Sequence, residues 1–332
     1  MHINTLILVK ISDSTAGVKL TSGTDGGIIR VPVLLGPTAT GKTGLALKIA
    51  LEFDMDIISC DSRQIYRYMD IGTAKPSAKE LKLVKHWMID TTEPDNAYSC
   101  YQFGMDAGKI IREHAAKGKN VLICGGSGLY FNSLRNGVGP TVPPQKCFRE
   151  KWLEKVHSQG NKYLFDELMR VDPETACTSH PSNVQRNIRA LEVYCYSGIP
   201  LSSLKSRSLP PQGIDFFVMS GTLPRHEIYR RIDNRVDSMI NNGLMDEFRA
   251  LLQKGYDITS PGMQCVGYKE LFIVKDNPAS LRLAVDEIKK NTRHYAKRQM
   301  TWFRHQVKST EVNMDDGAFE AAKKMIGEYL KS

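Results

Sequence analysis

Short apolar runs separated by longer amphipathic stretches dominate the hydrophobic pattern of the chain. Several runs have the length of buried strands, at residues 31–35, 56–60, 86–89, 120–124 and 215–221. Residues 99–116 place Phe103, Ala107 and Ile111 near helical spacing, which predicts an amphipathic helix. Strands that alternate with helices in this way predict an α/β fold with a doubly wound parallel sheet.

The alternation stops at a boundary rich in proline and glycine, residues 139–144. The pattern beyond it is helical and charged from residue 148 to about 196, and residues 243–308 are again mostly helical. We therefore expect a helical insertion and a helical C-terminal region. The predicted organisation is a core at residues 31–138 and 210–315, an insertion domain at 139–209 and a C-terminal helix at 316–332, with residues 1–30 unassigned.

The first apolar run leads into the sequence GPTATGKT and then into a helical apolar pattern. This spacing between a strand and a helix predicts a phosphate-binding P-loop and counts against a chance glycine-rich turn. The glycines let successive N–H groups surround anionic oxygens at the helix start. The lysine adds positive charge, and the threonine hydroxyl can bind Mg²⁺. We expect a di- or triphosphate on Gly36, Pro37, Thr38, Ala39, Thr40, Gly41, Lys42 and Thr43.

An aspartate, Asp61, follows the second predicted strand. Ligands of open α/β sheets bind at the carboxyl ends of the strands, so Asp61 is expected beside the P-loop. An aspartate in this position could equally be the N-cap of a following helix. The run at 120–124 is followed by Gly125 and Gly126, without the magnesium-orienting aspartate of many P-loop nucleotidases. Its absence counts against an ordinary nucleotidase.

Positive charge is concentrated towards the end of the chain. The 332 residues carry a formal charge of +9, which is consistent with a polyanionic partner. Residues 286–308 hold seven Lys or Arg against two acidic residues, with Tyr295, Trp302 and Phe303 interleaved. Such a stretch suits nucleic acid, although a core helix with a solvated basic face has the same pattern. Arg231 and Arg235 share a helix face, where they are either solvated or close on a phosphate.

The seven cysteines are scattered and contain no C-x-x-C pair. Neither a zinc site nor a disulfide framework is therefore predicted. Reduced, mostly buried thiols in a cytoplasmic protein are expected. No apolar run approaches the ~18 residues of a membrane span, so no membrane partner is predicted.

In combination, these stretches resemble the tRNA dimethylallyltransferases of the bacterial type, also called isopentenyl-diphosphate:tRNA transferases. The resemblance spans about residues 31–306, and no motif of the eukaryotic zinc finger accompanies it. Ser127 stands where the family usually has threonine, which keeps the hydroxyl. The matching motifs are GPTATGKT at 36–43, DSRQIY at 61–66, GTAKP at 72–76, GGSGLY at 125–130, QRNIRALEV at 185–193, RIDNRVD at 231–237, CVGYKE at 265–270 and TRHYAKRQMTWFR at 292–304.

The resemblance implies transfer of a dimethylallyl group from dimethylallyl diphosphate to N6 of the adenine 3′ of the anticodon in tRNA. Asp61 would take the amino proton, and Lys42, Arg235 and Mg²⁺ on Thr43 would stabilise the leaving pyrophosphate. The base must be flipped out of the anticodon stem-loop to be reached. The implied or expected tRNA contacts are Asp61, Ser62, Arg63, Gln64, Ser127, Arg149, Gln185, Arg186, Asn187, Ile188, Arg189, Gln264, Cys265, Gly267, Tyr268, Lys269, Arg293, Lys297 and Arg298.

Three alternatives stay open on sequence alone. An adenylate isopentenyltransferase shares the P-loop but needs no RNA surface, and a small-molecule P-loop kinase is more distant. The third alternative, an RNA-binding P-loop protein without turnover, leaves Asp61 without a role. The basic stretch and the helical insertion favour an enzyme acting on tRNA. A monomer is the default expectation.

Overall fold

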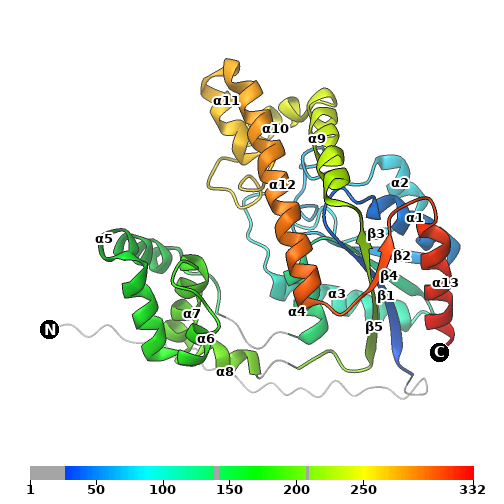
Figure 1. Cartoon of the computed structure of the whole chain (residues 1–332), viewed down its shortest axis with the longest axis horizontal. Helices are drawn as coiled ribbons and strands as arrows, with labels where there is room; N and C mark the ends of the chain where they lie inside the picture. The colour runs from blue at the N-terminus through cyan, green and yellow to red at the C-terminus, as the bar shows by residue number, and fades with distance from the viewer. Residues whose placement is uncertain (1–26, 138–141, 207–208) are drawn as a thin grey trace.

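The computed structural model describes residues 27–137, 142–206 and 209–332. A six-stranded parallel sheet has the order β3-β2-β4-β1-β5-β6 and carries helices on both faces (Figure 1), which confirms the predicted fold class. Residues 1–26 of the unassigned segment lie outside the described part, as do residues 139–141 of the predicted boundary. The strands are β1 (Ile29–Leu35), β2 (Met55–Cys60), β3 (His86–Trp87), β4 (Asn120–Gly125), β5 (Ile214–Thr222) and β6 (Thr310–Asn313).

Strand β1 lies inside the sheet between β4 and β5. Because helices cover both of its faces, its interior must be apolar, and Val31, Val33 and Leu35 are fully buried. Its last residue pairs with Gly125 of β4, which in turn pairs with Cys60 of β2. The loops that follow β1, β2 and β4 therefore leave the same edge of the sheet.

The core helices divide between the two faces of the sheet. On one face Leu45 and Ile49 of α1 pack in a cluster with Ile326 of α13, and on the other Phe103 and Ile111 of α3 join a larger cluster. Helix α3 begins after the capping box of Ser99, close to its predicted start. These helices are α1 (Lys42–Glu52), α2 (Ala78–Leu83), α3 (Cys100–Ala115), α4 (Gly128–Asn136), α9 (Arg225–Asn241), α10 (Leu244–Gln253), η1 (Lys269–Leu271), α11 (Phe272–Asp276), η2 (Pro278–Ser280), α12 (Leu281–Gln306) and α13 (Ala318–Lys331).

The helices between α4 and β5 form a lobe beside the sheet (Figure 1). They enclose a separate hydrophobic cluster around Leu164, Leu168 and Ile188, which supports the proposed insertion domain. The expectation of mostly buried thiols is wrong, because Cys147, Cys177 and Cys195 on these helices are exposed and Cys100 is only partly buried. The helices are α5 (Lys146–Val171), α6 (Pro173–Cys177), α7 (Val184–Ser197) and α8 (Leu201–Ser206).

The C-terminal segment contributes more than the predicted helix. Strand β6 pairs with β5 along the edge of the sheet, and α13 follows it. The hydroxyl of Tyr329 then accepts a hydrogen bond from the N–H of Val31 (3.2 Å) and donates one to the carbonyl of Asp215 (2.9 Å). The end of the chain is thus tied to β1 and β5. None of the helices in the described ranges is long and apolar enough to cross a membrane.

Candidate active site

The P-loop makes a tight turn between β1 and α1. Gly36 has φ +150°, and a Cβ there would lie 2.8 Å from the carbonyl oxygen of Gly221, so both its conformation and its surroundings require glycine. Gly41, with φ +92°, immediately precedes α1. Lys42 is buried, and its ammonium donates to the Pro37 carbonyl and to the Thr40 hydroxyl. Burial lowers the pKa of Lys42 to about 8, Cys124 and Asp61 oppose the shift, and Arg235 adds to it.

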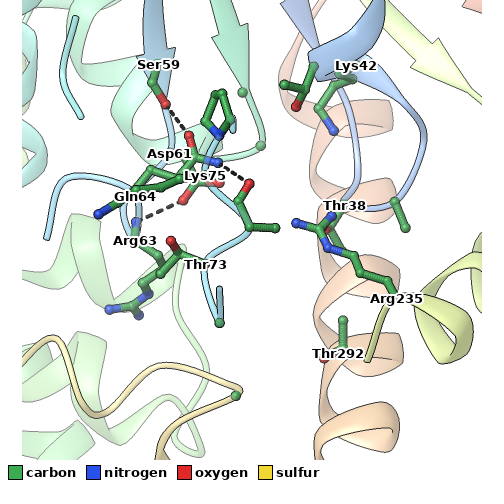
Figure 2. Close-up of a pocket in the computed structure, with 18 of the residues that line it drawn as sticks. Thr38, Lys42, Ser59, Asp61, Arg63, Gln64, Thr73, Lys75, Arg235 and Thr292 are labelled. Carbon is green, nitrogen blue, oxygen red and sulfur yellow. Dashed lines mark hydrogen bonds between the residues drawn. The ribbon is translucent and has the colours of Figure 1, made fainter. Parts of the chain in front are cut away.

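A cavity of about 540 Å³ opens in front of this loop. Figure 2 shows Thr38, Lys42 and Arg235 on one side of it and Asp61 on the other. Arg235, from α9, donates to the Thr38 hydroxyl (3.3 Å), and Arg231 lines the cavity one helical turn earlier. Burial lowers the pKa of Arg235, whereas Asp61 raises it. Positive charge from two separate elements therefore faces one side of the cavity.

Asp61 directly follows β2 and faces the same cavity. The N-cap interpretation is wrong, because turns rather than a helix follow it. One carboxylate oxygen, Oδ1, instead accepts a hydrogen bond from the backbone N–H of Arg63 (2.8 Å). Its charge raises the pKa of both Lys42 and Arg235, so the carboxylate lies within electrostatic reach of the phosphate-binding side.

The residues near Asp61 differ in their exposure and in their hydrogen bonds. Ser127 is buried, and its hydroxyl accepts a hydrogen bond from the N–H of Ser62 (2.8 Å). Gln64 accepts from the Ser59 hydroxyl (2.8 Å) and donates to the Ala74 carbonyl (3.1 Å), so it braces the loop. Arg63, in contrast, is exposed and lines the cavity.

The glycines at the end of β4 and directly after it lie too close to other residues for a side chain to fit. A Cβ at Gly125 would lie 2.1 Å from the Cys60 carbonyl oxygen. The same atom at Gly126 would lie 2.5 Å from Gln299, and at Gly128 it would lie 2.3 Å from Trp302, both on α12. The strand end therefore has no room for a carboxylate, which gives a structural reason for the missing aspartate.

A second cavity, of about 500 Å³, adjoins the first. The two share Arg63, Gly126, Tyr295 and Gln299 as lining residues. Six aromatic side chains line the second cavity, and the sequence pattern pointed only to the three on α12. The six are Tyr66, Tyr98, Tyr130, Tyr295, Trp302 and Phe303.

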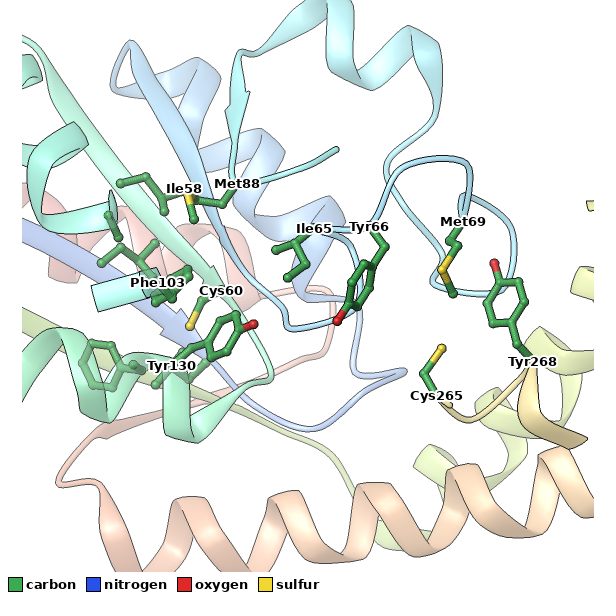
Figure 3. Packing of buried hydrophobic residues seen from close by; sticks show 14 of the residues in the cluster. Ile58, Cys60, Ile65, Tyr66, Met69, Met88, Phe103, Tyr130, Cys265 and Tyr268 are labelled. Carbon is green, nitrogen blue, oxygen red and sulfur yellow. The ribbon is translucent and has the colours of Figure 1, made fainter. Parts of the chain in front are cut away.

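The CVGYKE loop fixes the loop that contains Gly72. Figure 3 shows Cys265 and Tyr268 on the CVGYKE loop, with Tyr268 facing Met69. The Tyr268 hydroxyl donates to Glu247 and accepts from the N–H of Gly72 (3.1 Å). Of the predicted tRNA contacts here, Cys265, Gly267 and Tyr268 are buried, whereas Gln264 and Lys269 are exposed.

The predicted tRNA contacts in the QRNIR run of the insertion, residues 185–189, also include both exposed and buried side chains. Gln185 and Arg186 are exposed, whereas the side chains of Asn187 and Ile188 are buried within the lobe. Asn187 accepts a hydrogen bond from the Ser179 hydroxyl (2.6 Å) and donates one to the His180 carbonyl (3.1 Å). These contacts give Asn187 and Ile188 a packing role in the lobe.

The predicted tRNA contacts Arg149 and Arg189 both bind Glu192, a residue to which no sequence pattern pointed. Arg149 makes two hydrogen bonds to the Glu192 carboxylate, at 2.8 and 2.7 Å, and Arg189 makes another. Burial would raise the pKa of Glu192, but hydrogen bonds from Arg149, the Gln145 N–H and Arg189 outweigh it and lower this pKa. The carboxylate is therefore ionised and joins α5 to α7.

Glu192→Gln is expected to lower the free energy of unfolding by about 2 kcal/mol at pH 7, because a neutral amide loses the charge-assisted hydrogen bonds. A depressed pKa stabilises the folded state above the unfolded value of about 4.3, and this contribution is lost as the pH falls through the folded value. The difference should therefore vanish in acid. Urea denaturation measures it. The control Glu150→Gln, whose exposed carboxylate lies 3.9 Å from Lys146, should cost under about 0.5 kcal/mol. A pH-independent difference would contradict the assignment.

Helix α12 presents its basic side chains unevenly. Arg293 forms an ion pair with Asp233 of α9 (2.5 Å), and Lys289 pairs with Asp237 (2.6 Å). In the C-terminal half of α12, beyond these pairs, the exposed Lys and Arg side chains are Lys297, Arg298 and Arg304. Among the residues that the structure describes, no cluster of three or more His, Cys, Asp or Glu could hold a metal ion.

The known proteins that are similar to this chain in sequence and in structure belong to one family. A model of the family described as IPP transferase matches residues 64–306. The tRNA dimethylallyltransferase of Acetivibrio thermocellus is 42% identical over 300 residues, which cover 89% of this chain and 95% of that protein. The enzyme of the same name from Thermotoga neapolitana is 37% identical over 303 residues, covering 91% and 98%.

Solved structures of two such enzymes are also similar to the structure of this chain. The tRNA isopentenylpyrophosphate transferase of Bacillus halodurans has a TM-score of 0.66 and 34% identity, over 91% of this chain and 97% of that chain. A eukaryotic dimethylallyltransferase acting on tRNA has a TM-score of 0.77 and 23% identity, over 91% and 79%, and shares the fold. Both similarities include the sheet and the insertion, since they cover nine tenths of the chain.

Proposed function

The chain belongs to the IPP transferase family and is a tRNA prenyltransferase, and from this premise we propose how its own residues carry out the transfer. The donor is dimethylallyl diphosphate, and the acceptor is N6 of the adenine 3′ of the anticodon in tRNA. The adenylate isopentenyltransferase and kinase alternatives are not favoured, because the similar proteins are named for tRNA.

The diphosphate occupies the P-loop side of the cavity. Lys42 and Arg235 face this side, and backbone N–H groups at the start of α1 complete an anion site. As the bond between the allylic carbon and the diphosphate breaks, negative charge grows on the leaving group. Fixed positive groups stabilise this charge more than that of the bound substrate, which lowers the barrier.

Asp61 takes the proton of the acceptor. The adenine amino nitrogen forms a bond to the allylic carbon, its proton passes to the Asp61 carboxylate, and pyrophosphate leaves with the electron pair of the broken C–O bond. The aromatic cavity beside Asp61 suits the flipped nucleotide, because bases stack on aromatic rings. The observation that carries the proposal is that the P-loop and Asp61 face one cavity.

Mg²⁺ fits this site only as a partner of the substrate. The Thr43 side chain is exposed and lines the cavity, and no carboxylate cage accompanies it among the described residues. Mg²⁺ keeps several waters and commonly binds one or two protein groups together with phosphate oxygens. Thr43 would therefore hold the ion, which supplies positive charge to the diphosphate.

The decisive experiment incubates the protein with labelled dimethylallyl diphosphate and unmodified tRNA, and parallel reactions contain AMP or ATP. The label should enter tRNA at the adenine 3′ of the anticodon. Label in AMP but not in tRNA would establish a free-nucleotide enzyme. Phosphate transfer from ATP without prenylation would establish a kinase.

The tRNA surface combines α12 with the insertion. We assign the anticodon stem-loop to exposed side chains on both, with Gln264 and Lys269 at the neighbouring loop. The exposed charges of α12 contact phosphates. A monomeric, cytoplasmic enzyme is proposed on the sequence grounds given above. The proposed contacts outside the CVGYKE loop are Arg63, Gln185, Arg186, Lys297, Arg298 and Arg304.

The affinity for tRNA should fall linearly with salt on a logarithmic plot, because bound phosphates release counterions. Replacing Lys297 and Arg304 together by glutamine should reduce the slope by about 1–2 units. Fluorescence anisotropy between 50 and 300 mM salt (about the range in which screening is strong) measures the slope. Lys48→Gln with Lys324→Gln changes the net charge equally on α1 and α13 and should leave the slope unaltered. Equal slopes for both double variants would show that the basic face of α12 is only solvated.

A further inference from the structure

A buried glutamine of α12 connects the two sides of the site. Gln299 is 6% exposed. Its Oε1 accepts a hydrogen bond from the N–H of Thr38 (2.9 Å), and its Nε2 donates one to the carbonyl of Gly126 (2.8 Å). Because an N–H only donates and a carbonyl only accepts, these partners fix the orientation of the carboxamide.

The two partners belong to the two functional loops. Thr38 lies in the P-loop, and its hydroxyl also receives the hydrogen bond from Arg235. Gly126 precedes Ser127, whose hydroxyl accepts from the N–H of Ser62, directly after Asp61. A continuous path of hydrogen bonds and adjacent residues therefore runs from the phosphate side, through one side chain, to the loop of the proposed base.

Helix α12 holds this turn at further points. Tyr295, one helical turn before Gln299, lines both cavities. Trp302 lies so close to Gly128 that a Cβ there would be 2.3 Å from its ring, and Gly126 approaches Gln299 almost as closely. The helix thus cannot shift without moving the turn beside Asp61.

We propose that Gln299 is a positioning residue for prenyl transfer, which sets the separation between the bound diphosphate and Asp61. This inference rests on the proposed function. Reacting atoms need to lie about 3–3.5 Å apart, and a misplacement of about 1 Å can cost roughly 10²-fold in rate. A carboxamide with the reach of glutamine accepts from one loop and donates to the other at the same time.

Gln299→Asn is the sharpest test, because it keeps the carboxamide and removes one methylene, so that only one loop can be reached. We expect kcat for tRNA prenylation to fall about 10- to 100-fold, while the KM for each substrate changes less than about threefold. Gln306→Asn makes the same change at the exposed end of α12 and should leave both constants unaltered.

Gln299→Met keeps the length without polar atoms and should give the same separation of kcat from KM. The proposal is overturned if kcat stays within twofold of wild type, if only KM rises, or if activity falls in proportion to the unfolded fraction. Unfolding of both variants would assign Gln299 to stability and also overturn it. Failure of the wild-type protein to prenylate tRNA would instead refute the proposed function.

Discussion

Asp61→Asn is expected to lower the single-turnover rate of tRNA prenylation by about 10²–10⁴-fold, the usual contribution of a general base. The amide matches the carboxylate in size but cannot take the amino proton. Its Oδ1 can still accept the hydrogen bond from the N–H of Arg63, so the turn after β2 should persist. The loss is therefore expected in chemistry and not in folding.

Binding measurements separate a role of Asp61 in proton transfer from a role in substrate binding. The affinity for dimethylallyl diphosphate should barely change, because the P-loop holds the diphosphate. The affinity for tRNA should change modestly, since phosphate contacts dominate it. Asp257→Asn is a matched control, because its Oδ1 accepts from the N–H of Thr259 in an equivalent turn (2.8 Å). Near-normal turnover of Asp61→Asn with an unchanged melting temperature would remove Asp61 from catalysis.

Lys42→Ala is expected to raise the barrier to prenyl transfer by about 3 kcal/mol, or roughly 150-fold in kcat/KM. The reason is that Lys42 supplies a buried charge to a leaving group that becomes more negative in the transition state. Steady-state prenylation measures the loss, and Lys48→Ala, exposed on the same helix, is the control. A loss within twofold would contradict the assignment of Lys42 to the diphosphate.

The pKa of Lys42, about 8 in the unliganded protein, adds a pH dependence to this prediction. The protonated amine attracts the diphosphate, so affinity is complete below that value and falls as the pH rises through it. Lys42→Arg remains charged over this range and should lack the fall. Titration of dimethylallyl diphosphate binding between about pH 7 and 9.5, on both proteins, checks the sign.

The features that could be predicted from sequence either depend on a short segment alone or follow from the rule that ligands of a parallel sheet bind at the carboxyl ends of its strands. Each apolar run carries its own strand signal, and GPTATGKT specifies its turn through glycine. Asp61 reaches the P-loop because parallel strands end at one edge of the sheet. No contact between distant segments had to be known for these predictions.

The features that could not be predicted depend on packing between distant segments. Arg149 and Arg189 carry the charge typical of RNA contacts, yet a buried Glu192 binds both. Gln299 lies within a basic motif, and only the tertiary structure places it between Thr38 and Gly126. Strand β6 has four residues with one buried side chain, so as an edge strand it lacks an apolar run.

The hydrogen bonds that join Tyr329, near the end of the chain, to β1 and β5 affect the order in which parts of the molecule can fold. Strand β1 and strand β6 are more than 270 residues apart, which corresponds to roughly a quarter of a minute to a minute of translation at about 5–20 residues per second. The insertion helices contact mainly one another and can assemble while synthesis continues. The sheet edge at β6 and the Tyr329 contacts form only after nearly every residue has been made. A nascent or C-terminally clipped chain would therefore carry a folded insertion lobe before its catalytic core has closed.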